Sequence, residues 1–263
     1  VERSMFPMGY KPRFGNLVNN TAQRMECETL YWKDKTITLT NRNYDEVFGK
    51  ELDDINKYDP VDHKDAYARE HMIEYAHRTI EQTRKVVKEL CGKNKITSER
   101  YVMNKPKQLL HDIIGRIDYE TNKLFIELKT KPPSIVKKKG KDEYYFKTQP
   151  LGDDAVFDAY WGQVAFYWKC TGKKPFLVLV NDKEYLIYDD THAALYDDHL
   201  EYQYNMMVKR IYNWEQMIIY CKGDLQKLAD ISEPPDLNHF YHYKFLTDKQ
   251  RKTIKQLWGL DAW

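Results

Sequence analysis

The stretch HDIIGRIDYETNKLFIELKTK, residues 111–131, decides the fold that the sequence predicts. Its first third is apolar enough for a strand that ends at Asp118, and the Glu-Thr-Asn triplet that follows has the composition of a turn. From Lys123 onward apolar and polar residues alternate, which predicts a second strand and therefore a β-hairpin. The period of two places Glu127 and Lys129 on one face, and the hairpin brings Asp118 near them.

This group of side chains suits metal-assisted hydrolysis of a phosphodiester. Two carboxylates can hold a hard divalent cation through oxygen atoms and leave positions open for water and phosphate. A lysine beside them can orient or deprotonate the water and offset phosphate charge. The alternative is a surface hairpin with an ordinary Glu–Lys pair, because 31% of the residues are charged and such patterns also arise by accident.

Composition sets the outer limits of the interpretation. With 263 residues the chain can bury a substantial core, and with a net charge of only +2 any nucleic-acid contact must come from local basic patches. The 21 tyrosines suit either stacking on bases or packing with an exposed hydroxyl. No apolar run approaches 18 residues and no signal-like N-terminus is visible, so we expect a soluble, intracellular protein without membrane contact.

The order of predicted elements is that of a mixed α/β sheet flanked by helices. Three segments are expected: an N-terminal extension of short hairpin and loops at 1–63, a core at 64–222, and a C-terminal helical extension at 223–263. The other expected elements are a hairpin at 29–40, a helix at 65–90, a strand at 98–104, a basic loop at 134–150, a helix at 153–170, strands at 176–180 and 184–188, and helices at 195–220 and 248–258.

In this order, the motifs resemble those of the PD-(D/E)XK (restriction-endonuclease-like) nuclease superfamily. The resemblance is greatest to its RecB-like branch, which contains the mitochondrial genome maintenance exonuclease and phage-encoded relatives. It covers residues 65–190. The motifs that carry it are Gly115-Arg116-Ile117-Asp118, Glu127-Leu128-Lys129, and Gln163 followed four residues later by Tyr167.

The resemblance implies a hydrolase that cleaves DNA with Mg²⁺ or Mn²⁺. Asp118 and Glu127 would hold the metal, with the Leu128 carbonyl as an extra ligand. Lys129 would position the attacking water. The remaining motif residues, which would contact the DNA backbone near the scissile phosphate, are Gln163 and Tyr167.

The first helix of the family supplies a further metal ligand, and two alignments fit this chain. One keeps a histidine, His77, and the other places Glu70 at that position. A carboxylate serves a hard cation as well as an imidazole does, so both residues stay candidates, with a slight preference for Glu70. The four cysteines are scattered and lack the cluster that iron–sulfur members carry, so we expect reduced cysteines and no iron–sulfur cluster.

The expected substrate is single-stranded DNA or frayed ends, degraded exonucleolytically in phage-type replication, recombination or degradation, in the host cytoplasm if the gene is phage-encoded. The lysines of 137–141 would neutralise phosphates, and the aromatic side chains of Tyr144, Tyr145, Tyr160 and Trp161 would stack on unpaired bases. The alternatives are a catalytically inactive nucleic-acid-binding module, an endonuclease of the same fold, or a structural protein whose tyrosine-rich helices form an assembly interface. Oligomeric state and strand polarity stay open.

Overall fold

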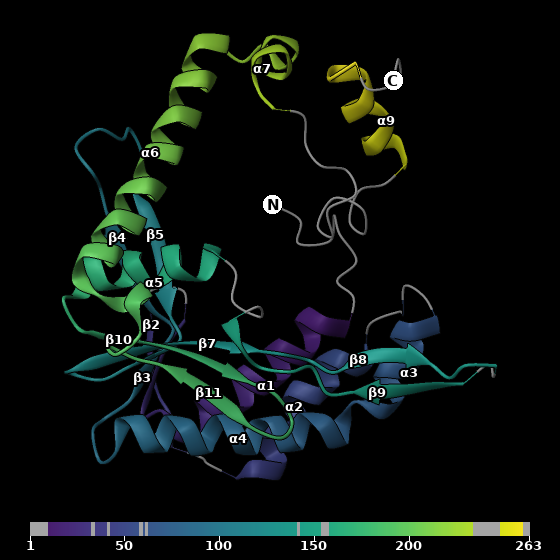
Figure 1. The fold of residues 1–263 in the computed structure, drawn as a ribbon. Coiled ribbons are helices and arrows are strands. Elements are labelled where there is room, and N and C mark those ends of the chain that lie inside the picture. Colours follow the sequence, from purple (N-terminus) through teal and green to yellow (C-terminus); the bar gives the residue numbers. More distant parts are fainter. Residues whose placement is uncertain are drawn as a thin grey trace. The chain divides into compact units, whose positions relative to one another are not determined.

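The computed structural model describes residues 10–32, 35–40, 43–57, 60, 63–140, 143–153, 158–233 and 248–259 (Figure 1). The chain divides into two compact units. The larger has its described residues within 10–104 and 113–205, and the smaller within 105–112 and 206–259. The three segments expected along the chain stay a prediction, whereas the mixed α/β sheet flanked by helices is what the larger unit contains.

The main sheet of the larger unit has seven strands among the described residues, in the order β11-β10-β7-β6-β3-β1-β2. The strand β7 pairs with β10 in parallel and with β6 antiparallel. Both faces of β10 are covered after the exposed Lys174, which explains why the rest of its sequence, PFLVLV, is continuously apolar. The bounds are β1 Thr29–Trp32, β2 Lys35–Thr38, β3 Thr97–Ser98, β6 Tyr119–Glu120, β7 Leu124–Thr130, β10 Lys174–Val180 and β11 Tyr185–Tyr188.

A second, two-stranded sheet joins β4 (Arg100–Asn104) to β5 (Ile113–Ile117). The predicted strand at 98–104 is therefore interrupted once, at Glu99, which lies between β3 and β4. The antiparallel register of β3 with β6 continues without a shift into that of β4 with β5. It places Glu99 opposite Asp118, where both strands bend. Glu99 has a φ of 57°, a conformation that non-glycine residues adopt rarely.

Two helices cover opposite faces of the sheet at β7 (Figure 1). Ile126 and Leu128 share a core with Val87 of α4 (Ile73–Cys91). Phe125, from the alternate face, meets the ring of Tyr167 edge-on, and Tyr167 belongs to α5 (Asp158–Thr171). The predicted alternation of β7 therefore holds, and it places Glu127 and Lys129 on the face that α5 covers.

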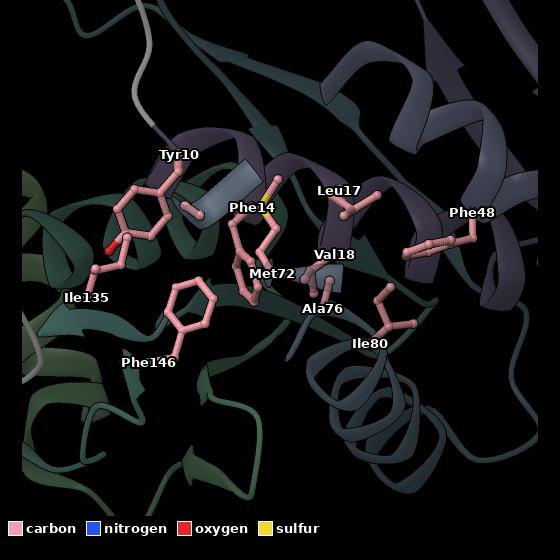
Figure 2. Close-up of a cluster of buried hydrophobic side chains, with 11 residues drawn as sticks. Tyr10, Phe14, Leu17, Val18, Phe48, Met72, Ala76, Ile80, Ile135 and Phe146 are labelled. Carbon is pink, nitrogen blue, oxygen red and sulfur yellow. The ribbon is translucent and has the colours of Figure 1, made fainter. Parts of the chain in front are cut away.

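The helix α1 (Tyr10–Glu26) was not predicted, and it is central to the core. Its residues Phe14, Leu17 and Val18 pack on α4, as Figure 2 shows. The same cluster includes Phe48 of α2 (Tyr44–Asn56), a helix of 13 residues in a stretch, 41–62, that was expected to be mostly loop or short helix. Burial of these side chains explains why a polar-looking N-terminal segment folds as helices rather than loops.

Two further expectations were inaccurate. The helix predicted at 65–90 is two helices, α3 (His63–His71) and α4, that meet at Met72. Met72 is fully buried in the cluster of Figure 2. The basic loop expected at 134–150 contains a hairpin, β8 (Ser134–Lys137) with β9 (Tyr144–Lys147), because Ile135 and Phe146 face each other across it and enter the same cluster.

The smaller unit contains the end of α6 (Asp197–Cys221), together with α7 (Leu225–Ile231) and α9 (Asp248–Leu257). Within it, Glu215 accepts hydrogen bonds from the backbone N–H groups of Leu110 and His111. Gln226 donates to the carbonyl of Leu257 and so links α7 to α9. Among the described residues, no helix is both long enough and apolar enough to cross a membrane.

Candidate active site

The strand β7 carries a buried ion pair at its centre. The Lys129 Nζ atom lies 2.5 Å from Oε1 of Glu127 and 2.8 Å from Oε1 of Gln163. The Glu127 side chain is 1% exposed and that of Lys129 is 21% exposed. Although burial alone would lower the pKa of Lys129, the carboxylates of Glu127 and Asp118 raise it, so this lysine is held as a cation.

The helix α5 completes a chain of hydrogen bonds that begins at Lys129. Gln163 and Tyr167 lie one turn apart, and Gln163 Nε2 donates to the Tyr167 hydroxyl at 2.9 Å. The hydroxyl donates in turn to the carbonyl of Arg116 on β5 at 2.6 Å. Burial is the main cause that raises the pKa of Tyr167, so the hydroxyl stays a donor. The predicted Gln163 and Tyr167 therefore fix the orientation of α5 against two strands.

Asp118 lies at the bend between β5 and β6, where its side chain leaves the strand alternation. Its Oδ2 atom accepts a hydrogen bond from the backbone N–H of Leu128 at 2.8 Å. Because that bond comes from the residue between Glu127 and Lys129, it holds the Asp118 carboxylate next to both. Burial and the nearby Glu127 raise the pKa of Asp118 well above its ordinary value, against the opposing effect of Lys129.

One of the two carboxylate oxygens of Glu127 has no hydrogen-bond partner among the described residues. Its Oε1 atom meets Lys129, whereas its Oε2 atom is buried without a hydrogen-bond partner. Burial raises the pKa of Glu127, and the ammonium of Lys129 opposes that rise. A buried, unpartnered carboxylate oxygen is costly. Together with Asp118 it forms an oxygen donor set of the kind that hard divalent cations take.

At Gly115 the strand β5 packs closely against the side chains of α5. A Cβ atom there would lie 2.5 Å from the Tyr167 ring and 2.8 Å from the ring of Phe166. Only glycine therefore lets β5 approach α5 closely enough for the Tyr167 hydroxyl to reach the Arg116 carbonyl. The Gly-x-x-Asp motif thus combines a packing requirement at Gly115 with a functional group at Asp118.

Two residues beside the carboxylates were missed by the sequence interpretation. Glu99 lies opposite Asp118, and its charge raises the pKa of both Asp118 and Glu127. Gln23 of α1 donates to Oε1 of Glu99 at 2.9 Å and lies 3.4 Å from the Asp118 carbonyl oxygen. The apolar spacing of α1 would have identified the helix, but nothing local to Glu99 indicates that it lies opposite Asp118.

The two candidates for a third ligand do not join this group. The His77 ring stacks on Phe48 with centroids 4.1 Å apart, and its Nδ1 atom lies 2.6 Å from the Tyr44 hydroxyl. Burial lowers the pKa of His77, as expected for a neutral ring packed on α2. The Glu70 side chain is two-thirds exposed and lies near His71. Within the described ranges, no group of three or more His, Cys, Asp or Glu side chains converges to hold a metal ion.

Of the aromatic side chains expected to stack on bases, one contacts the lysines of the site and others pack elsewhere. The Tyr160 ring faces Nζ of Lys129 at 4.8 Å and Nζ of Lys131 at 5.3 Å, so it belongs to the site itself. Trp161 instead stacks on His192, and Tyr144 packs against Tyr67.

In the basic stretch 137–141, Lys137 ends β8 and residues 138–140 follow it. Lys138 pairs with Glu143 at 2.7 Å, and Tyr145 is exposed on β9. Lys141 lies outside the described residues. The hairpin core therefore orients this stretch, which was expected to be a loop throughout.

Comparison of the chain with family models, with curated proteins and with solved structures found no match. The resemblance of the motifs therefore rests on their residues alone and stays a prediction.

Proposed function

We propose that this protein is a metal-dependent deoxyribonuclease of the PD-(D/E)XK type that shortens linear, single-stranded DNA from its ends. One observation supports it most strongly. Lys129 contacts both Glu127 and Gln163 of α5, and the backbone N–H of Leu128 holds the Asp118 carboxylate beside them. A purely structural ion pair requires neither the second carboxylate nor the unpartnered Oε2 atom of Glu127.

The donor set fits Mg²⁺ or Mn²⁺. Asp118 and Glu127 would hold the ion, with the Leu128 carbonyl as a further ligand. The charge of the ion would offset the burial and the nearby Glu127 carboxylate that raise the pKa of Asp118. When bound, such an ion polarises the phosphoryl oxygen and lowers the pKa of a water ligand. Glu70 and His77 are not part of this proposal, since their contacts lie elsewhere.

Lys129 has the geometry of a positioning group for the attacking water. Its ammonium is held between Glu127 and Gln163 and faces Tyr160, so its direction is fixed before substrate arrives. A preorganised donor of this kind stabilises charge that develops on the phosphate oxygens at no reorganisation cost. Gln163 and Tyr167 orient that lysine through the hydrogen bonds of α5, and the second N–H of the Gln163 amide would donate to the DNA backbone.

The experiment is digestion of end-labelled DNA and RNA oligonucleotides, single- and double-stranded, with Mg²⁺, Mn²⁺ or EDTA. We expect shortening of single-stranded DNA that requires metal and that Asp118→Asn abolishes. The matched control is Asp190→Asn, an exposed acid paired with Lys174 at 2.9 Å, which should cleave like the unaltered protein. DNA binding that no metal converts into cleavage would show that the protein is a binding module and that the proposal is wrong.

A further inference from the structure

The outer face of the two-stranded sheet β4–β5 exposes an unusual row of large side chains. Tyr101, Met103 and Ile114 are 44%, 64% and 62% exposed, and Arg116 lies on the same face. We call these four residues the β4–β5 ridge. Met103 pairs with Ile114 across the strands, and Tyr101 pairs with Arg116. Large apolar side chains grouped on one exposed face mark a contact surface more often than side chains scattered singly do.

The ridge is supported by the opposite face of the same two strands. Val102 is buried there, and Gly115 packs against the rings of Phe166 and Tyr167. Because α5 fixes this inner face, the outer side chains project from a rigid platform rather than from a loose hairpin. Such a platform can bind a ligand without a large ordering cost.

The ridge leads along its two strands to Asp118 of the candidate active site. Along the strands, the pair Met103–Ile114 is followed by Tyr101–Arg116 and then by the opposed Glu99 and Asp118. Successive pairs are about 7 Å apart along the strands, since a strand rises roughly 3.4 Å per residue. An extended single strand of DNA that passes Asp118 can therefore place one nucleotide beside each pair.

We propose that the β4–β5 ridge stacks the unpaired bases of the DNA strand adjacent to the scissile phosphate; this rests on the proposed nuclease function. Arg116 lies over the Tyr101 ring at 5.8 Å and pairs with Glu99 at 3.1 Å, so one cation borders both a stacking face and the site. Stacking on aromatic and apolar side chains is indifferent to base identity. A protein partner fits less well, because a stable interface takes about 20–30 residues from each side.

The test separates contacts to bases from contacts to phosphates. Binding of two fluorescent, single-stranded oligonucleotides is measured in Mg²⁺ on an Asp118→Asn background: one is normal DNA and the other carries abasic residues along its length. The ridge variant is Tyr101→Thr/Met103→Thr/Ile114→Thr, which keeps residues that favour strands. The control is Ile37→Thr, which alters an exposed isoleucine on the edge strand β2.

We expect the protein to bind normal DNA at least about fivefold more tightly than abasic DNA, the low end for one stacked base. The ridge variant should lose that preference and leave the affinity for abasic DNA unchanged, and Ile37→Thr should keep it. An unchanged preference in a variant that unfolds at the same temperature would overturn the proposal. A ridge variant that loses self-association on gel filtration but keeps its base preference would assign the face to a second copy instead, which also overturns it.

Cleavage by the unaltered protein distinguishes the two proposals. If the unaltered protein cleaves DNA and the ridge variant keeps its preference for normal over abasic DNA, only the stacking proposal is wrong. If the ridge variant loses the preference for normal over abasic DNA but the unaltered protein does not cleave, only the nuclease proposal is wrong. If both hold, the ridge variant on an active background should raise KM for linear single strands about fivefold or more and leave kcat unchanged.

Discussion

Replacing Lys129 with methionine should make the stability of the protein depend strongly on pH. The substitution keeps the aliphatic volume but removes the charge that lowers the pKa of Glu127, a side chain that is 1% exposed. Removing one partner of a buried ion pair costs about 3–5 kcal/mol while the other stays charged. The lost hydrogen bond to Gln163 adds about 1 kcal/mol.

The sign of the pH dependence follows from proton binding. Glu127 has a raised pKa in the folded protein, and the variant raises it further, so the folded state holds a proton that the unfolded state has already released. Stability then falls as pH rises from the ordinary glutamate value to the raised one. At about pH 5 the loss should be smaller than at about pH 8, because the raised pKa keeps more of Glu127 protonated at the lower pH. Once Glu127 is protonated, only the lost hydrogen bond, about 1 kcal/mol, remains. At about pH 8 the full loss of about 4–6 kcal/mol is expected, the sum of the two contributions.

The assay is urea unfolding in EDTA at the two pH values. The control is Lys174→Met, which removes the exposed partner of Asp190 and should cost about 0–1 kcal/mol at either pH. The double variant Lys129→Met/Glu127→Gln should recover much of the loss at the higher pH, because position 127 then carries no unpaired buried charge. A loss in Lys129→Met that is equal at both pH values, or below about 1 kcal/mol at pH 8, would refute the buried ion pair as described.

Three further predictions concern packing, ligands and metal. Gly115→Ala should cost about 1–3 kcal/mol in thermal unfolding and also lower cleavage, since its Cβ meets Tyr167 at 2.5 Å, whereas Gly162→Ala, with open space around it, should be neutral or stabilising. His77→Ala should lower stability, because its packing on Phe48 is lost. Both His77→Ala and Glu70→Ala should leave the Mn²⁺ affinity, measured by calorimetry, unchanged. A loss of Mn²⁺ affinity in either variant would show that the replaced residue is a metal ligand. Mn²⁺ at a hundredfold excess over its Kd should stabilise the unaltered protein by about 2.7 kcal/mol. The same Mn²⁺ concentration should hardly stabilise the Glu127→Gln variant. Equal stabilisation of the two proteins would show that Glu127 is not a metal ligand.

The sequence predicted those parts of the fold that depend on short-range periodicity. The alternation of β7 places Glu127 and Lys129 on one face wherever the strand packs, and the spacing of Gln163 and Tyr167 places both on one face of any helix. The positions of these four side chains follow from such local rules, whereas Asp118 lies at a bend and is held by the backbone N–H of Leu128. The helix α1 follows the same rules: the apolar spacing that buries Phe14 and Leu17 could have been recognised among its polar residues, but it was not.

Other features depend on contacts between distant segments and so could not be predicted locally. Glu99 reaches the site because β3 and β4 share one register with β6 and β5, and because the backbone bends at that pair. His77 faces α2 because Tyr44 and Phe48, more than twenty residues earlier, form its pocket. The face of a helix that meets a site is decided by such partners and not by the helix sequence alone.

The most direct test of the central claim is digestion of a linear single-stranded oligonucleotide, and of the same oligonucleotide ligated into a circle, with Mn²⁺. We predict that the linear form is shortened progressively and that the circle persists. Lys129→Ala should lower the rate on the linear form by about a hundredfold or more, the effect of losing one preorganised donor. Equal loss of circle and linear DNA would show an endonuclease. No metal-dependent loss of either would contradict the assignment of Asp118, Glu127 and Lys129 as a nuclease site.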